Sequence, residues 1–586
     1  MSTETDPQTR SLKDSIHPVV FPVSAVLILA VAIFAMALPE RAETAFSETR
    51  LFLEGTFGWF YILVMAALLV VAVFLVVSPY ARIKLGPDDS EPDYSTPAWF
   101  AMLFSAGMGI GLVFWGVAEP VFIFDAPPFA EGGTDAAAQE SMNFVFHHWG
   151  FSPWAVYAII GLGLAFFGFR KGMPMAIRSL FRPLLGDKVD GPIGNAIDII
   201  AVVATMFGIV TSLGLGVTQI AAGLEYVTGW EPGNGGLVLI IGVITAMAAV
   251  SVMGGLDKGI KRLSQINIAA AGLLAAAVML AGPTLFLIFA FVDNTGSYLQ
   301  NMINTLLLTG SYDEGARDFL DAWTIFYWAW WISWSPFVGM FIARVSYGRT
   351  IRQFVLGVLL APTIVSFMWF TIFGNTALAT DGVVDGVLEL GTDVGMFVLL
   401  ENLALPGAMV TALSILVIFV VAVFFVTSSD SGSFVIDMLT SGGDLNPRVE
   451  TRVFWAVSEG VLAAALLLAG GEAGLDGLQA AAIAAGLPFA VVLVFAIWSL
   501  LKGLREEVPR APRDRPRGDL PATIPEATRR EREQRERELE LRARELDLKE
   551  QELEQWEEEL ATNGGGGSSS PGGGGPSAPP DPGRAP

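Results

Sequence analysis

Long apolar runs alternate with short polar segments through the first 500 residues of the chain. A helix needs about 20 mostly apolar residues to cross the hydrocarbon core of a bilayer. Twelve runs meet this requirement, so the pattern predicts an all-α polytopic membrane protein with twelve transmembrane helices. The predicted spans lie near residues 19–39, 56–78, 97–122, 143–168, 195–227, 236–254, 267–292, 321–343, 353–376, 407–438, 452–470 and 481–501.

The loops between the predicted spans differ in their content of Lys and Arg. If the N-terminus is cytoplasmic, the inner segments before residue 500 carry 17 of these residues and the outer loops carry 3. Lys and Arg are enriched in the cytoplasmic loops of membrane proteins. We therefore expect both termini on the cytoplasmic side of the membrane.

The composition limits the classes of function that the chain can serve. With no Cys and three His among 586 residues, it offers no thiol nucleophile, no disulfide and little material for a histidine metal site. A formal net charge of −23 disfavours a nucleic-acid partner. The sequence has no phosphate-binding P-loop or other enzyme motif, so we expect no ATP-driven step, no enzyme activity and no organic cofactor.

The most unusual stretch is the segment 321–337, which contains five tryptophans. Membrane helices usually place Trp at the two interfaces, whereas Trp330, Trp331 and Trp334 fall near the middle of a span. On a helix, Phe326, Trp330 and Trp334 form one stripe, with Trp331 on the same half of the cylinder. Ring faces attract cations, and aromatic cages suit quaternary ammonium groups. The stretch predicts such a cage, and an aromatic packing ridge between helices is the alternative.

The third span contains alternating glycines at Gly107, Gly109 and Gly111. Each glycine weakens a helix by about 1 kcal/mol. Unwound backbone in the middle of a membrane is tolerated where it lines a cavity, and its free carbonyl oxygens suit sodium. The stretch therefore predicts an unwound segment that binds an ion, with a small-residue groove for close helix packing as the alternative.

The fourth span opens with a second aromatic cluster. Trp149, Trp154 and Tyr157 lie beside Pro153, which interrupts helical hydrogen bonding. These rings are candidates for the same binding site, and their position near a span end fits interface anchors equally well.

The tenth span carries hydroxyl groups and an aspartate within the segment 424–433, including Thr427 and Ser428. Polar groups are costly at this depth in a bilayer, so we expect them to face the protein interior. There they would bind a ligand or pair with a neighbouring helix. Hydroxyl oxygens are suitable ligands for a hard cation.

These stretches together resemble the betaine/carnitine/choline transporter family, and most closely its bacterial sodium-coupled glycine betaine carriers. The segment 323–344 is similar to the family signature, and the glycine, Phe-His-His-Trp and Phe-Val-Thr-Ser stretches match in the expected order over about residues 15–505. The resemblance implies a LeuT-like core of two inverted five-helix repeats, here spans 3–7 and 8–12, preceded by two N-terminal helices. It also implies a homotrimer in the bacterial plasma membrane.

The resemblance further implies roles for particular residues. The implied substrate-binding residues are Trp149, Trp154, Tyr157, Phe326, Trp330, Trp331, Trp334, Met108, Gly109 and Gly111. The implied sodium ligands are Ser105, Met108, Phe424, Thr427 and Ser428, and a second sodium site would include Thr205 and Phe337. Choline carriers of the family tend to have aspartate at the position of Gly111, so this chain is expected to prefer a zwitterion.

The second sodium site departs from the family pattern. The family uses two threonines four residues apart on span 5, whereas here Thr205 is followed at that spacing by Ile209. Isoleucine has no side-chain oxygen, so this site lacks one expected ligand. Thr211 or Ser212 could compensate, although their spacing does not show it.

The function implied by the resemblance is secondary active uptake of a quaternary-ammonium or sulfonium zwitterion for osmoprotection, with glycine betaine as the expected substrate. Uptake would proceed by sodium symport with alternating access, so sodium is the expected coupling ion. The alternatives are sodium-independent or proton-coupled transport of choline- or carnitine-type substrates and, more distantly, a transporter-like sensor.

The segments outside the expected transporter domain, residues 17–505, differ in composition. Residues 1–16 are polar and are expected to be cytoplasmic, without a cleavable signal. Residues 506–524 form a basic, proline-rich linker suited to anionic lipid. Residues 525–561 predict a charged cytoplasmic helix, either a coiled coil with leucines at heptad spacing or a solvated helix. Residues 562–586 are rich in Gly, Ser and Pro and are expected to be disordered.

Overall fold

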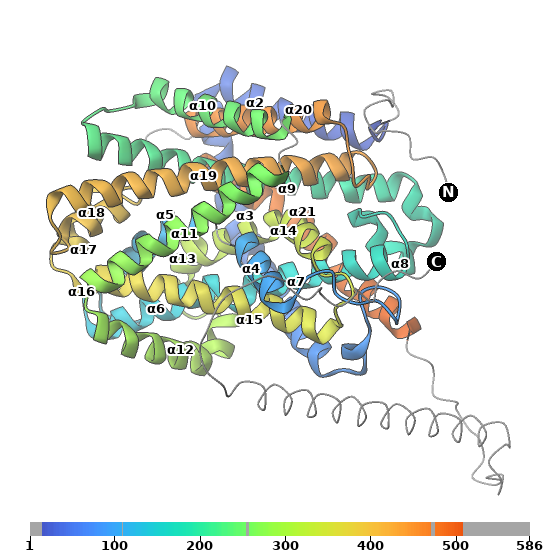
Figure 1. Cartoon of the computed structure of the whole chain (residues 1–586), viewed down its shortest axis with the longest axis horizontal. Coiled ribbons are helices and arrows are strands. Elements are labelled where there is room, and N and C mark those ends of the chain that lie inside the picture. The colour runs from blue at the N-terminus through green and yellow to red at the C-terminus, as the bar shows by residue number, and fades with distance from the viewer. Residues whose placement is uncertain (1–14, 108, 254–256, 470–474, 508–586) are drawn as a thin grey trace, which may run out of the picture. The chain divides into compact units, whose positions relative to one another are not determined.

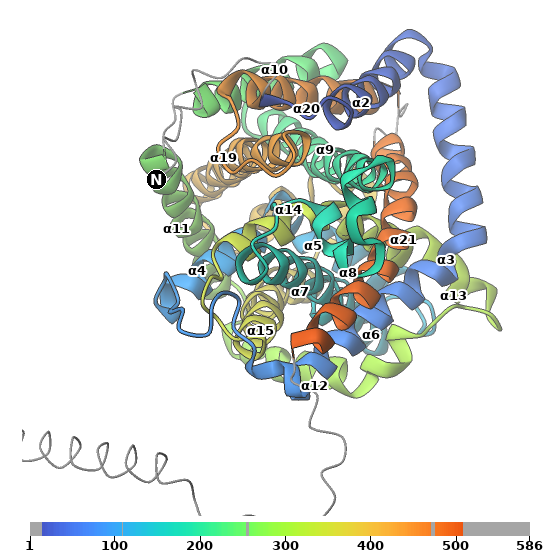
Figure 2. The same cartoon turned by 90° about the vertical axis from the view of Figure 1, so that its right-hand side faces the viewer.

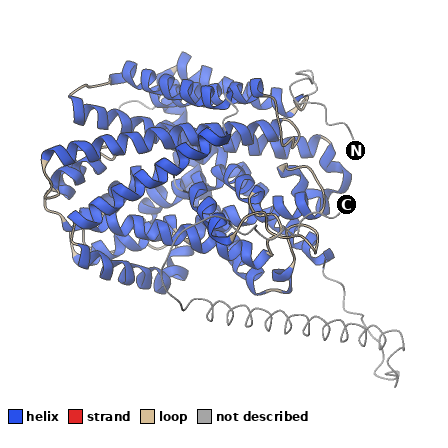
Figure 3. Cartoon of the chain, in the orientation of Figure 1, coloured by secondary structure: helices blue, strands red, loops and turns tan. Residues whose placement is uncertain are grey.

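The computed structural model describes residues 15–507 except 108, 254–256 and 470–474. Within this part, every regular element is helical apart from an isolated bridge between Lys84 and Thr350 (Figure 3). The predicted all-α class is confirmed for these residues. The α-helices are α2 (Val20–Ala37), α3 (Pro39–Val77), α4 (Thr96–Gly107), α5 (Ile110–Asp125), α6 (Asp135–Trp149), α7 (Phe151–Ala165), α8 (Arg182–Leu185), α9 (Pro192–Thr228), α10 (Gly233–Met253), α11 (Asp257–Ala281), α12 (Thr284–Leu306), α13 (Glu314–Phe319), α14 (Ile325–Arg344), α15 (Ile351–Phe370), α16 (Thr376–Ala379), α17 (Val383–Leu390), α18 (Gly395–Asn402), α19 (Gly407–Thr440), α20 (Val449–Ala469) and α21 (Leu475–Glu507).

Ten helical segments of the described chain are long and apolar enough to cross a membrane. They coincide with ten of the twelve predicted spans, which confirms a multi-pass membrane protein. The other two predicted spans, 97–122 and 321–343, do not meet this length and composition. The first is divided between α4 and α5, and the second contains Trp, Tyr, Ser and Pro, which lower its mean hydropathy. The count of twelve and the repeat relation stay predictions.

The third predicted span is interrupted at its glycines. Helix α4 ends at Gly107 and α5 begins at Ile110. Between them, Gly109 has an extended backbone, with φ −145° and ψ −170°. The predicted unwinding is therefore confirmed at Gly109, while Met108 lies outside the described residues.

The seventh predicted span ends earlier than expected. The candidate span in this region is Arg262–Ala281, and the chain then bends at Pro283 before α12 begins. Proline has no backbone N–H to donate, so α11 cannot continue through it. Residues up to 292 were predicted to belong to this span, but they form the first turns of the separate helix α12.

Helix α14, which carries most of the tryptophans, lies inside the bundle. It packs against α7, α9 and α21, and nearly all of its side chains are buried. Figures 1 and 2 both show α14 in the interior, with α2, α10 and α20 together along one side. The aromatic stretch is therefore enclosed by protein instead of facing lipid.

Both ends of the chain extend beyond the described part. Most of the expected N-terminal segment 1–16 and nearly all of the linker, charged helix and tail predicted for 506–586 lie outside the described residues. The predictions for these segments stay predictions.

Candidate binding site

The seven aromatic residues predicted to bind substrate are all buried, and their rings form one connected cluster. Each ring has its centroid 4.6–6.4 Å from that of at least one other member. Three helices contribute, since one residue ends α6, two lie on α7 and four lie on α14. We call this cluster the cage, and its members are Trp149, Trp154, Tyr157, Phe326, Trp330, Trp331 and Trp334.

Both faces and edges of the rings meet within the cage. Trp330 and Trp331 stack with centroids 4.6 Å apart and ring planes inclined by 14°. Trp149 approaches Trp331 edge-on, with centroids 4.9 Å apart. Tyr157 approaches Trp331 and Trp334 edge-on, at 6.4 and 6.2 Å. Ring contacts of this kind occur both in a ligand cage and in a packing ridge. The hydrogen-bond partners of the indole N–H and phenol O–H groups distinguish the two.

The glycines of the interrupted span lie against the cage. A Cβ atom placed on Gly111 would lie 2.6 Å from Trp330 Cη2 and 2.9 Å from Trp149 Cη2. A Cβ atom on Gly109 would lie 3.8 Å from Trp334, an ordinary contact distance. The structure thus brings Gly109 and Gly111 to the predicted site, and only a glycine fits at 111 without moving the rings.

A buried carboxylate on α5, Glu119, anchors two of the aromatic side chains around the cage. Its Oε2 accepts hydrogen bonds from Trp149 Nε1 at 2.7 Å and from Tyr327 Oη at 2.5 Å. Its Oε1 lies 2.7 Å from Nδ1 of His148. Glu119, His148 and Tyr327 were not among the site residues predicted from the sequence. An acidic residue inside an apolar span is the signal that could have identified Glu119.

The network around Glu119 extends to the start of the tryptophan-rich segment. Nε2 of His148 lies 2.9 Å from Oγ1 of Thr324, in a π-helical turn at residues 320–324 that leads into α14. A neutral His148 can donate from Nδ1 to the carboxylate and accept at Nε2 from the threonine. The network therefore links α5, α6 and α14 through paired groups, and it fixes the orientation of Trp149.

The polar atoms of four cage residues fall into two groups. Trp331 Nε1 donates to the carbonyl of His148 at 2.9 Å, and Trp330 Nε1 donates to the carbonyl of Gly208 at 3.2 Å. In contrast, Trp334 Nε1 and Tyr157 Oη are buried and find no partner among the described residues. Buried polar groups are normally hydrogen-bonded. Two unpartnered donors on neighbouring rings favour a ligand site over a packing ridge.

The predicted first sodium site is only partly described. Phe424 is buried on α19, and Thr427 Oγ1 donates to the carbonyls of Val423 at 3.0 Å and Phe424 at 3.2 Å, which leaves its lone pairs free. Ser428 lies beside Thr427 on α19. Met108 and the side chain of Ser105 lie outside the described part of the chain. This sodium site therefore stays a prediction.

The predicted second sodium site contains one free hydroxyl. Thr205 is buried, and its Oγ1 has no partner among the described residues. Ile209 packs against Gly432. A Cβ atom placed on Gly432 would lie 2.4 Å from Cδ1 of Ile209. The predicted member Phe337 is buried with its ring 5.7 Å from that of Trp334.

The two residues considered as replacements at this second site use their hydroxyl protons elsewhere. Thr211 Oγ1 donates to the carbonyls of Phe207 at 2.8 Å and Leu478 at 3.2 Å. Ser212 Oγ donates to the carbonyl of Gly208 at 3.3 Å. These contacts use only the hydroxyl protons, as in Thr427, so compensation by either residue stays a prediction.

Comparison with known proteins identifies the family. Residues 19–509 match the profile described as BCCT, betaine/carnitine/choline family transporter. The chain belongs to this family. The resemblance seen in the sequence is confirmed, and five of the seven cage residues of this BCCT family member lie on the segments that carried the resemblance.

Named relatives are similar over most of their lengths. The glycine betaine transporter OpuD of Bacillus subtilis is 44% identical over 508 residues, which cover 84% of this chain and 98% of the relative. A glycine betaine/proline/choline transporter of Vibrio parahaemolyticus is 43% identical, with 84% and 91% covered. An uncharacterised transporter of Mycobacterium tuberculosis is 48% identical, with 85% and 84% covered. The BCCT family member is thus similar to bacterial membrane transporters of small solutes.

Proposed function

We propose that this BCCT family member takes up glycine betaine, or a closely related quaternary-ammonium or sulfonium zwitterion, by sodium symport with alternating access. The observation that carries the proposal is the cage with its two free donors, Trp334 Nε1 and Tyr157 Oη. The named relatives support the solute class, because one is a glycine betaine transporter by name and another a glycine betaine/proline/choline transporter. Osmoprotection is the physiological role that follows from uptake of such a solute.

The two ends of a zwitterion match the two kinds of group in the cage. Ring faces hold the quaternary ammonium group, and each desolvated cation–π contact contributes about 2 kcal/mol. Three or four rings give about 6–8 kcal/mol, near the ~8 kcal/mol of a micromolar site. The carboxylate of the solute can accept hydrogen bonds from Trp334 Nε1 and Tyr157 Oη. No carboxylate of the protein is needed to bind the ammonium group.

Gly111 supports a preference for zwitterions over choline. Because Trp330 and Trp149 occupy the space beside it, the site has no room for an acidic side chain at this position. A net cation such as choline then meets no acidic side chain at position 111, and it also lacks the carboxylate that the two free donors would bind. We propose that choline competes weakly with glycine betaine.

Sodium is the proposed coupling ion because a zwitterion gains nothing from the membrane potential. Thr427 and Ser428 supply hydroxyl oxygens on α19, and the unwound segment at Gly109 offers backbone carbonyls. The assembly and lipid contacts implied by the family resemblance, a homotrimer with its basic C-terminal strip on anionic lipid, belong to the same proposal.

Uptake of radiolabelled glycine betaine into proteoliposomes that contain the purified full-length protein tests the proposal. We expect accumulation with an inward sodium gradient and little with an equal potassium gradient. Unlabelled glycine betaine should compete strongly, and choline and proline weakly. Equal uptake in both gradients would exclude sodium symport, and stronger competition by choline than by betaine would exclude the substrate assignment.

A further inference from the structure

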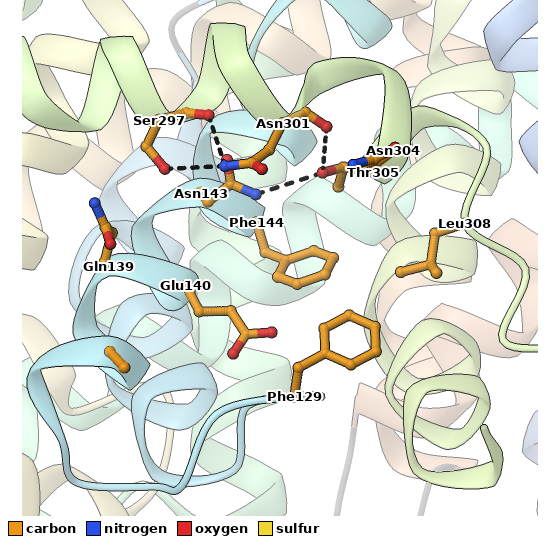
Figure 4. A pocket seen from close by; sticks show the side chains of 11 residues that line it. Phe129, Gln139, Glu140, Asn143, Phe144, Ser297, Asn301, Asn304, Thr305 and Leu308 are labelled. Carbon is orange, nitrogen blue, oxygen red and sulfur yellow. Dashed lines mark hydrogen bonds between the residues drawn. The ribbon is translucent and has the colours of Figure 1, made fainter.

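A cavity lies between α6 and α12 and shares no lining residue with the cage (Figure 4). Its volume is about 380 Å³, within the range of sites for small organic molecules. The distribution of Lys and Arg places this end of both helices on the outer side of the membrane. The lining residues are Phe129, Ala136, Gln139, Glu140, Asn143, Phe144, Ser297, Asn301, Asn304, Thr305 and Leu308.

One wall of this outer cavity is a row of hydrogen-bonded polar side chains on α12 (Figure 4). Asn301 Nδ2 donates to the carbonyl of Ser297 at 3.0 Å, and Thr305 Oγ1 donates to the carbonyl of Asn301 at 3.1 Å. Asn143 on α6 donates from Nδ2 to Thr305 Oγ1 at 3.4 Å. These contacts hold the wall in place, so the cavity has a defined shape.

Two acceptor oxygens of the outer cavity are left without partners. Glu140 Oε2 accepts from the backbone N–H of Ala130 at 2.7 Å, which fixes the carboxylate, while Oε1 has no partner among the described residues. Asn143 is only 8% exposed, and its Oδ1 is likewise unpartnered in the described chain. Unpaired buried acceptors are uncommon. No Lys or Arg is among the described residues lining the cavity, so its polarity favours a cation.

The remaining lining residues decide which cation fits. Rings of Phe129 and Phe144 line the same cavity as the Glu140 carboxylate (Figure 4). A hard divalent metal ion needs oxygen atoms around it at about 2.0–2.6 Å, and this space is far larger than such a shell. A quaternary ammonium group has no N–H to donate and is held by ring faces and charge. The combination of two rings, one carboxylate and amide oxygens matches that chemistry.

Phe144 joins the outer cavity to the network that braces the cage. Its ring centroid lies 6.2 Å from that of His148, which is bound to Glu119, and 4.6 Å from that of Phe319 on α13. The cavity and the cage thus share helix α6, which carries Asn143 and Phe144 in one site and Trp149 in the other. A ligand in the outer cavity would contact the same helix that positions the cage.

We propose that the outer cavity is a separate binding site for the quaternary ammonium group of a small cationic or zwitterionic solute. Glu140 supplies the charge, Phe129 and Phe144 supply ring faces, and Asn143 supplies an amide oxygen. The proposal takes its solute class from the proposed function, but it depends neither on transport nor on sodium coupling. Absence of sodium-driven uptake in proteoliposomes would therefore not contradict the proposed outer site.

Equilibrium binding of radiolabelled tetramethylammonium to purified full-length protein tests this site. The Trp334→Leu variant serves as the background, because it weakens the cage, and tetramethylammonium has no carboxylate for the cage donors. We expect saturable binding to persist in this background. Adding Glu140→Gln should weaken it by about tenfold, because glutamine can keep the contact to Ala130 but removes the charge.

Two further variants make the test specific. Phe129→Leu should also weaken binding by about fivefold or more, and this residue is 58% exposed, so its replacement tests the ring with little risk to folding. Glu131→Gln is the matched control, because Glu131 is an exposed carboxylate in the same loop and does not line the cavity. Tetramethylammonium should bind equally well to the Trp334→Leu background with and without Glu131→Gln.

Three results would overturn the proposal. The first is the absence of saturable binding in the Trp334→Leu background. The second is binding that neither Glu140→Gln nor Phe129→Leu weakens, or that Glu131→Gln weakens equally. The third is displacement of the label by low concentrations of sodium at constant ionic strength, which would make the cavity a metal-ion site. Should Glu140→Gln fail to give monodisperse protein, Phe129→Leu decides.

Discussion

Trp149 donates its indole N–H to the Glu119 carboxylate over 2.7 Å, and both side chains are buried. The two residues lie on different helices, α6 and α5, so this bond ties a cage ring to a neighbouring element. The same carboxylate oxygen accepts from Tyr327 on α14. One anchor therefore positions aromatic side chains from two helices around the proposed solute.

Replacing Glu119 by glutamine should weaken glycine betaine binding. Glutamine keeps one acceptor but turns an N–H₂ group toward either His148 or the two donors, Trp149 and Tyr327. An unsatisfied buried polar group costs about 1–3 kcal/mol, which corresponds to roughly tenfold or more in Kd. Isothermal titration of the purified variant with glycine betaine, together with its elution as monodisperse protein, measures the effect.

The adjacent histidines provide a matched control for this network. His148→Asn removes a ring bonded to both Glu119 and Thr324, whereas His147→Asn removes an equally buried neighbour that packs against Trp328 and makes neither bond. We expect His148→Asn to lower affinity as Glu119→Gln does, and His147→Asn to affect mainly thermal stability. Equal losses of affinity in the two variants would mean that general packing, and not the network, positions the cage.

The sequence predicted the apolar spans and the aromatic cage because both depend on residue type and local periodicity. Ten long runs are apolar enough to indicate membrane spans, and tryptophans in the middle of a span are unusual. The unwound turn at Gly109 was predictable because glycine favours leaving the helix. Pro283 indicates the early end of the seventh span, because proline interrupts a helix. The apolar residues on both sides of it made the two helices look like one span.

The network around Glu119 could not be assembled from the sequence. Its members come from α5, α6 and α14, at sequence separations of 29 to 208 residues, and only tertiary packing brings them together. A lone acidic residue in an apolar span signals function but does not name its partners. The outer cavity could be predicted only in part. Glu140 and Asn143 are close together on α6, but the opposite wall with Asn301 lies on α12, far along the chain.

Trp334→Phe should separate the two proposed roles of this residue. Phenylalanine keeps a ring face but lacks the free Nε1–H, so it should weaken glycine betaine binding through loss of the carboxylate contact. A hydrogen bond to a charged group contributes about 1.5–3 kcal/mol, so we expect roughly tenfold or more. Tetramethylammonium, which has no carboxylate, should lose much less affinity for the cage.

Trp334→Leu, which removes the ring as well, should weaken glycine betaine binding by about 1–2 kcal/mol or more beyond the loss in Trp334→Phe. Both ligands are compared by displacement of labelled glycine betaine, in a Glu140→Gln background that removes the outer site. Unchanged glycine betaine affinity in both Trp334 variants would reduce this residue to a packing role.

Gly111→Ala should impair the cage, and Gly109→Ala serves as its control. The added methyl group at 111 would approach Trp330 and Trp149 to within 3 Å and force the rings to shift. Such overpacking typically costs about 1–3 kcal/mol. At 109 the methyl group meets only Trp334 at 3.8 Å, and the extended backbone accepts alanine.

In isothermal titration with glycine betaine, we expect roughly tenfold or greater loss of affinity for Gly111→Ala. Gly109→Ala should show a loss of no more than about threefold. The reverse order of the two variants would contradict the placement of these glycines against the cage.

The stoichiometry of sodium is the last prediction, and it follows from Ile209. Each sodium ion moving down the membrane potential supplies about 2.3 kcal/mol per 100 mV. At about 150 mV one ion gives ~3.5 kcal/mol, enough for a few hundred-fold accumulation, and two give ~7 kcal/mol. With Thr205 unpartnered and no oxygen on Ile209, we expect one sodium per solute, held by Thr427 and Ser428.

Sodium titration of uptake and the reversal potential in proteoliposomes measure this stoichiometry. A Hill coefficient near 1 and one charge per solute are expected, and the Thr427→Ala, Ser428→Ala double variant should lose sodium coupling. Ile209→Thr places a hydroxyl one helical turn from Thr205, so it should raise the Hill coefficient if the missing oxygen is what disables the second site. Two charges per solute in the native protein would refute the prediction, because a second sodium must then be held by ligands other than a threonine pair on α9. Sodium coupling that survives the double variant would reject the site on α19 as well.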